Sequence, residues 1–204
     1  MPRRSTVNVK INPEVLKGSL STGRNGFIVS KKIDDIIKSE IAKKQDTLIK
    51  NFYTHKVSME IQEGPRANNS SGTLGGYGNL YSFLGFRRGD NPLMVIEEIF
   101  AKKIRYKVRG RNNRGQFLIT IYVPTKKEVW EETPMPWASG MSWSKSIEKG
   151  VNNAAAYLFN PEGYKNSRSG SGLQANQRVS GVTFKKTSYI TRLLADFRND
   201  LRKL

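Results

Sequence analysis

Apolar residues recur with the period of a helix between residues 33 and 52, at spacings of three, four and seven, with Lys and Asp between them. The positions that form this stripe are Ile33, Ile36, Ile37, Ile41, Leu48, Ile49 and Phe52. This spacing predicts an amphipathic helix of about twenty residues, with Ser30 as its N-cap.

Three further segments carry shorter helical stripes. Pro92 suits the first turn of a helix that continues through residues 93–100. A second stripe follows from about Ser144 to Leu158, and a third closes the chain. The third stripe consists of Ile190, Leu193, Leu194, Phe197 and Leu201.

The period changes to two after residue 102, where Ile104, Tyr106 and Val108 alternate with basic residues. A β-branched segment follows at residues 117–123, and the loop GRNNRG separates the two at residues 110–115. Alternation of this kind predicts a hairpin with one apolar face and one charged face. The charged face of the first strand consists of Lys103, Arg105, Lys107 and Arg109.

Residues 1–30 and 160–181 differ from the rest of the chain. The first segment is rich in Gly, Ser, Asn and basic residues, although Val7, Val9 and Ile11 alternate and could form one strand. We interpret it as a flexible or interaction arm. The second is polar and rich in Gly and Ser, which indicates a loop excursion, and a short strand is expected at residues 182–184.

The remaining pattern predicts one α+β domain over residues 31–204. An antiparallel sheet containing the basic hairpin is expected to pack against the long N-terminal helix and the C-terminal helix. Neither an internal repeat nor a second core is evident.

The net charge of the chain limits the classes of molecule that it is expected to bind. The chain has 35 Lys and Arg against 17 Asp and Glu, a formal net charge of +18. Such an excess points to nucleic acid, an anionic surface or acidic proteins. No stretch is apolar enough to span a bilayer or to act as a secretion signal, so a soluble protein is expected.

Residues suited to catalysis or metal binding are scarce. There is no cysteine, which excludes disulfides and thiolate metal sites, and the carboxylates are scattered without motif spacing. The one histidine, His55, lies at a predicted helix end, where a cationic side chain would cap carbonyl groups. We therefore expect no catalytic residues, no metal, no cofactor and no enzymatic activity.

The stretch SGTLGGYGNLYSFLGF, residues 71–86, combines glycines with large apolar side chains. A P-loop needs a Lys where Asn79 stands, and a dinucleotide-binding turn needs a third glycine where Tyr81 stands. The glycines therefore suit tight turns. The large side chains are expected to pack either on the core or on a neighbouring subunit; they are Leu74, Tyr77, Leu80, Tyr81 and Phe83.

Tryptophans offer a second set of contact residues. Trp130, Trp137 and Trp143 fall in one short window. They could stack on bases, but such residues are more often core or interface anchors. Trp137 and Trp143 are therefore candidates for a subunit interface.

The basic hairpin is the sharpest chemical feature. Residues 102–114 contain seven Lys and Arg and no acid. A strand face of this kind can follow a phosphate backbone, or it can be a solvated or protein-docking face. The candidate contact residues for DNA or for an acidic partner are Lys103, Arg105, Lys107, Arg109, Arg111 and Arg114.

Three segments together resemble a known family. They are GPRANNSSGTLGG with NLYSFLGF, then PMPWASGMSWSKSIEKG, and then SRSGSGLQ leading into FKKTSYITRLLADF. These resemble the neck and tail-completion proteins of tailed bacteriophages, also described as head-tail joining proteins. The resemblance extends over about residues 30–204, with the Gly-rich and Trp-rich blocks as its longest parts.

The resemblance implies a non-enzymatic α+β subunit of the virion, assembled in the host cytoplasm. It also implies a closed homo-oligomeric ring, commonly a hexamer, at the head-tail junction, in a neck, tail-completion or tail-terminator role. DNA passes through such a ring. Partners would be the adjacent head connector and tail proteins, with contact to genomic double-stranded DNA possible. The alternative is a sequence-nonspecific DNA-binding protein that uses residues 102–114.

Overall fold

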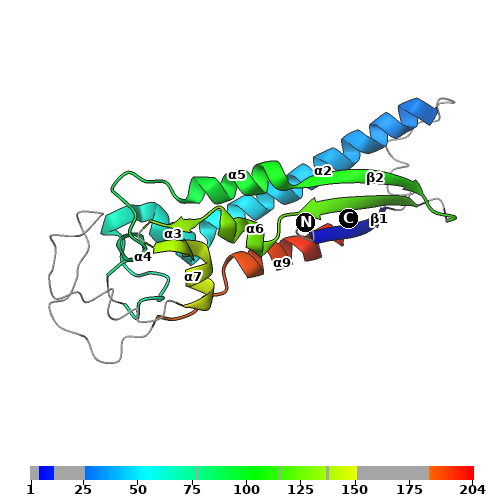
Figure 1. The fold of residues 1–204 in the computed structure, drawn as a ribbon. Coiled ribbons are helices and arrows are strands. Elements are labelled where there is room, and N and C mark those ends of the chain that lie inside the picture. Colours follow the sequence, from blue (N-terminus) through cyan, green and yellow to red (C-terminus); the bar gives the residue numbers. More distant parts are fainter. Residues whose placement is uncertain (1–4, 12–25, 77, 115, 137, 151–183) are drawn as a thin grey trace. The chain divides into compact units, whose positions relative to one another are not determined.

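The computed structural model describes residues 5–11, 26–76, 78–114, 116–136, 138–150 and 184–204 (Figure 1). The fold is α+β, as predicted, with a small antiparallel sheet and helices. The chain divides into two compact units. The first unit comprises Met1–Lys50, Ile99–Thr125 and Leu193–Leu204, and the second comprises Asn51–Glu98 and Lys126–Arg192.

The first unit contains a three-stranded antiparallel sheet. Its strands are β1 (Ser5–Ile11), β2 (Arg105–Arg111) and β3 (Phe117–Val123), in the order β1-β3-β2 (Figure 1). Ile121 of the central strand β3 lies opposite Val7 of β1 on one side and opposite Tyr106 of β2 on the other. One face of the sheet is buried and includes Val7, Val9, Ile11, Phe117, Ile119, Ile121 and Val123.

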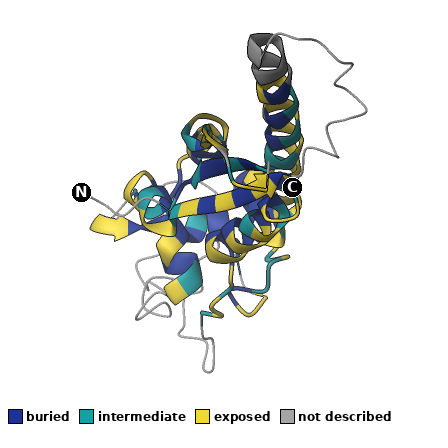
Figure 2. Ribbon diagram, turned by 90° about the vertical axis from the view of Figure 1, so that its right-hand side faces the viewer, coloured by how far each residue is buried: buried dark blue, intermediate teal, exposed yellow. Residues whose placement is uncertain are grey.

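Helix α2 (Gly26–Thr54) contributes the predicted apolar stripe up to Ile49 to this unit, and buried positions alternate with exposed ones along it (Figure 2). The hydroxyl of Tyr106 in β2 donates to Oδ1 of Asp34 in α2, at 3.0 Å. The stripe lapses at Gln45, whose side-chain amide donates to the carbonyls of Phe100 and Ala101 at 2.8 and 2.9 Å. A polar residue is accommodated there because it satisfies the C-terminal carbonyls of another helix, α5 (Leu93–Lys103).

Helix α9 (Ile190–Leu201) contributes its C-terminal part to the first unit. Leu193, Leu194, Phe197 and Leu201 are buried there. The guanidinium of Arg198 donates to the carbonyl of Pro124, the residue after β3, at 3.1 Å. The predicted arrangement of a basic hairpin with an N-terminal and a C-terminal helix is therefore present in this unit.

The second unit consists of short helices and a two-stranded sheet. Its elements are α3 (Lys56–Glu63), η2 (Gly64–Arg66), α4 (Leu80–Phe83), α6 (Lys126–Glu131), β4 (Pro134–Met135), β5 (Ala138–Ser142) and α7 (Trp143–Lys149). Tyr189 lies wholly buried in its core. Its ring stacks on Phe52 at 6.0 Å, and its hydroxyl shares a 2.6 Å hydrogen bond with Ser58.

Several boundaries differ from those predicted. Helix α2 begins at Gly26 and not after Ser30. Residues 5–11, which we assigned to an arm, form the edge strand β1, which pairs with the central strand β3, as their alternation allowed. Helix α7 ends at Lys149 because Gly150 takes a φ of 84°, a conformation that glycine adopts without strain.

Other predictions fall partly on residues that the structure does not describe. The loop excursion at 160–181 lies outside the described residues, as do 151–158 of the predicted helix and 182–183 of the short strand. Phe184, the last residue of that strand, is described and is not in a strand. Among the described residues, no helix is both long and apolar enough to cross a membrane.

Candidate nucleic-acid interface

The outer face of the three-stranded sheet brings together basic residues of its two edge strands, β1 and β2, on either side of β3. Residues directly opposite each other in an antiparallel sheet share a face. Thr6 and Arg105 both lie opposite Tyr122, and Asn8 and Lys107 both lie opposite Thr120. Lys10 lies opposite Leu118 on the same side. We call these positions, together with Arg109, the outer sheet face.

The cations of the outer sheet face are exposed. They are Lys10, Arg105, Lys107 and Arg109. No acidic residue occurs anywhere in β1, β2 or β3. An array of exposed cations without interspersed carboxylates produces a positive potential over the face, which attracts polyanions.

Arg109 is placed by an irregularity in β2. The register shifts between Val108 and Gly110, so that Arg109 is the extra residue of a β-bulge, and Gly110 takes a φ of 123°. Nε of Arg109 donates to the hydroxyl of Thr120 at 3.3 Å, and this hydroxyl donates to the side chain of Asn8 at 3.1 Å. These bonds link all three strands across the outer sheet face and hold Arg109 over its middle.

The hairpin tip is shorter than predicted. Strand β2 continues to Arg111, and the loop closes through Asn112, whose backbone N–H donates to the carbonyl of Gln116 at 2.9 Å. Oδ1 of Asn112 accepts from the backbone N–H groups of Arg114 and Gln116 at 3.0 and 2.9 Å. Arg114 is exposed at this tip.

Two of the predicted contact residues stand elsewhere. Lys103 is the last residue of α5 and not part of the strand, because the helix extends to it and β2 begins at Arg105. The backbone of Arg111 lies opposite Phe117, and the side chain of Arg111 is outside the described part. Conversely, Lys10 joins the outer sheet face although sequence reasoning placed it in an arm. The sequence offered one signal, which is that Lys10 alternates with the apolar residues Val7, Val9 and Ile11. Only the pairing of β1 with β3 shows which residues lie beside it.

The glycine-rich segment is organised around Glu60, a fully buried residue of α3. The carboxylate accepts from Asn69 Nδ2 at 2.8 Å, from the backbone N–H of Ser71 at 2.9 Å, and from that of Leu80 at 2.8 Å. Oδ1 of Asn69 in turn accepts from the backbone N–H groups of Leu74 and Gly76. A buried carboxyl group is tolerated here because several donors surround it. Sequence reasoning did not identify Glu60.

Most of the large side chains proposed for a subunit interface lie inside the second unit. Leu74 and Leu80 are fully buried, and Tyr81, Phe83 and Trp143 are nearly so. Of the two alternatives, core or neighbouring subunit, packing on the core describes these five. Tyr77 and Trp137 lie outside the described residues.

His55 occupies a different capping position from the one expected. It is the N-cap of α3, and its Nδ1 accepts from the backbone N–H of Val57 at 3.2 Å. It therefore caps a donor at a helix start and not carbonyls at a helix end. Burial, with a further contribution from the positive charge of Arg192, holds the pKa of His55 below its ordinary value, although a backbone hydrogen bond with Ser188 opposes the shift.

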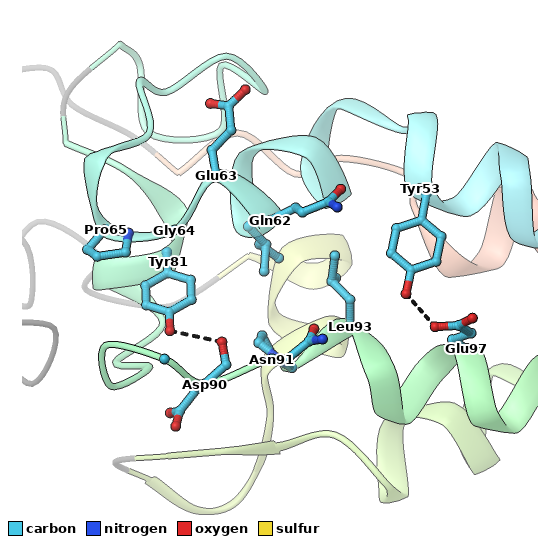
Figure 3. A pocket seen from close by; sticks show the side chains of 13 residues that line it. Tyr53, Gln62, Glu63, Gly64, Pro65, Tyr81, Asp90, Asn91, Leu93 and Glu97 are labelled. Atoms are coloured by element: carbon cyan, nitrogen blue, oxygen red, sulfur yellow. Dashed lines mark hydrogen bonds between the residues drawn. The ribbon is translucent and has the colours of Figure 1, made fainter.

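A cavity of about 670 Å³ opens in the second unit (Figure 3). Tyr53 donates to Glu97 on one side, and Tyr81 donates to the carbonyl of Asp90 on the other. Burial and the bond to Glu97 raise the pKa of Tyr53 to about 12. The carboxylate of Glu63 points away from the cavity in Figure 3, so the acidic side chains do not converge on one point.

The described residues contain no group of three or more His, Asp and Glu side chains placed to hold a metal ion. Comparison of the chain with models of known protein families gives no match. No curated protein and no solved structure matches it either. The similarity to phage neck proteins rests on the residues quoted for it.

Proposed function

We propose that this protein is a structural component of a tailed-phage virion, which forms a homo-oligomeric ring at the head-tail junction. Its role there is assembly, with the head connector and the tail proteins as neighbours. The proposal starts from the sequence segments that resemble neck and tail-completion proteins.

The observation that supports it most is that described residues of these segments, far apart in the sequence, contact one another in the second unit. Phe86 of the first segment packs edge-on against Trp143 of the second, with ring centroids 5.7 Å apart. Phe83 packs against Phe184 of the last segment, at 5.5 Å. The backbone N–H of Lys185 also donates to the carbonyl of Thr73 at 2.8 Å.

The second and last segments are joined as well. The carboxylate of Glu148 accepts from the backbone N–H groups of Tyr189 and Thr191, at 3.2 and 2.6 Å, and from the Thr191 hydroxyl at 2.7 Å. Three separate short resemblances thus converge on one packed structural element. This convergence favours one shared architecture over three accidental similarities.

The experiment is to locate the chain in particles of a phage that encodes it. Mass spectrometry of purified virions should detect it, and antibody labelling should place it between head and tail. Light scattering of the purified chain should give an assembly of about six 23.1 kDa subunits. Absence from the virion, or labelling confined to the capsid shell or the tail tip, would contradict the proposal.

A further inference from the structure

We propose that the outer sheet face is a binding surface for the phosphate backbone of double-stranded DNA. This inference concerns the first unit alone and does not rest on the proposed virion role. Either proposal can fail while the other stands.

The first argument is the placement of charge. Arg105 and Lys107 are alternate residues of one strand, so they are about 6.8 Å apart along it, which equals the rise of two nucleotides of one DNA strand along the helix axis. Lys10 stands on the opposite edge strand β1, which is about 9.6 Å from β2 across β3, and it is level with Leu118, two residues along β3 from the residue opposite Lys107. The cations therefore form a two-dimensional array and not a single row at the hairpin tip.

The second argument is that the array is partly fixed in place. Arg109 is bonded to Thr120, and Thr120 is bonded to Asn8, so one guanidinium is held over the centre of the sheet. A cation already ordered before binding loses less side-chain entropy when it contacts a phosphate. A merely solvated face would not require this bridge between strands.

The third argument favours a duplex over a single strand. Proteins that bind single strands combine cations with several aromatic side chains on which bases stack. Among the positions of the outer sheet face, Tyr122 is the one aromatic residue, and it is only half exposed. The neighbouring Asn8 is a short, exposed polar residue that suits contacts with phosphate oxygens.

Binding should have a defined salt dependence. If four cations each neutralise one phosphate, log K falls with log salt with a slope of about −3.6. This slope corresponds to a loss of affinity of about 150-fold between 50 and 200 mM salt.

The test measures fluorescence anisotropy of a labelled random-sequence duplex with the full chain. The quadruple variant Lys10→Gln, Arg105→Gln, Lys107→Gln and Arg109→Gln should lose at least tenfold in affinity at low salt, and most of the slope. A matched control removes four exposed cations of the second unit, through Lys56→Gln, Arg66→Gln, Lys149→Gln and Lys185→Gln. It has the same net charge and should keep its affinity within about twofold.

Two further variants keep the test decisive. Arg105→Lys with Arg109→Lys retains the charges and should retain the slope. If the quadruple variant does not fold, as judged by circular dichroism, Lys10→Gln with Lys107→Gln should remove about half of the slope.

Three results would overturn the proposal. One is an equal loss of affinity in the quadruple variant and its control, which would mean that net charge alone governs binding. Another is tighter binding of a single strand of equal length than of the duplex. The last is binding of labelled poly-glutamate by the outer sheet face with no binding of the duplex, which would make the face a dock for acidic proteins.

Discussion

Glu60 and His55 are ionisable side chains of the second unit that each accept backbone N–H groups. Glu60 binds the N–H groups of Ser71 and Leu80, and His55 binds that of Val57. Nδ1 of His55 accepts only while it carries no proton. The backbone at the start of α3 therefore depends on the protonation state of His55.

Replacing Glu60 by Gln should destabilise the chain by about 3 kcal/mol, because the new amide group would face buried donors that have lost their acceptor. Urea unfolding followed by tryptophan fluorescence measures this loss. Glu63→Gln is the control, since Glu63 is exposed at the end of the same helix, and it should change stability by no more than about 0.5 kcal/mol. Equal effects of the two substitutions would show that the Glu60 bonds do not stabilise the loop.

The His55 cap predicts an acid-sensitive contribution to stability. The pKa is lowered in the folded chain, so folding favours the neutral ring. The contribution is complete above the unfolded value of about 6.5, and it is lost as pH falls through the lower folded value. Because His55 is the one histidine of the sequence, its ring proton resonances in NMR should titrate with a midpoint below 6.5.

The matched variant is His55→Asn, which keeps an N-cap acceptor but does not titrate. Between pH 6.5 and 5, the parent chain should lose more unfolding free energy than this variant. Parallel pH profiles would contradict the assignment of the cap.

At the scale of elements, helix α9 depends on a residue of another helix to satisfy the N–H groups at its start. Its stripe of buried residues is clear in the sequence, yet its first turn contains no acidic residue to meet the unpaired N–H groups there. Glu148 of α7 supplies that acceptor from a distant part of the chain. The start of α9 is thus set by tertiary contact.

Glu148→Ala should therefore lower the free energy of unfolding by about 1–2 kcal/mol, the usual cost of losing an N-terminal cap. Lys149→Ala, at the neighbouring exposed position, is the control and should be nearly neutral. Thermal unfolding by circular dichroism measures both. A neutral Glu148→Ala would show that α9 does not need the borrowed carboxylate.

At the scale of the whole molecule, the proposed virion role and the proposed DNA-binding surface are argued from different units. The second unit contains the contacts between the segments that resemble neck proteins, whereas the first unit contains the basic sheet. The net charge of +18 is far from zero, which raises the on-rate for any polyanion without determining which surface binds it. The position of the cations on one sheet face is what makes a specific surface testable.

Separation of the two roles gives a prediction for assembly. The quadruple variant of the outer sheet face should lose DNA affinity but still form the oligomer of the parent chain, because its substitutions spare the second unit. Light scattering at 0.15 M and 0.5 M salt measures this. Loss of the oligomer in a folded quadruple variant would instead place the subunit contact on the sheet.

Local pattern was sufficient for the longer elements, but it did not predict the short ones of the second unit, namely α3, η2, α4, α6, β4 and β5. Apolar spacing identified the stripes of α2, α5 and α9, and alternation identified β2, β3 and the strand character of Val7 to Ile11. These predictions succeeded because a helix or strand buries one face, and the period of that face is written in neighbouring residues. Boundaries were less accurate, as at Gly26 and Lys103, because the ends of helices depend on what satisfies their terminal groups.

The sequence by itself therefore determined the α+β class, the helical stripes, the basic strand and the exclusion of cysteine chemistry. Only the tertiary structure decided that β1 pairs with β3, which brings Lys10 beside the hairpin cations, and that Glu60 organises the glycine-rich segment. It also decided that Leu74, Leu80 and Phe83 belong to the core. The physical reason is that strand neighbours and buried hydrogen bonds join residues far apart in the chain, and a local pattern holds no information about which distant partner each one meets.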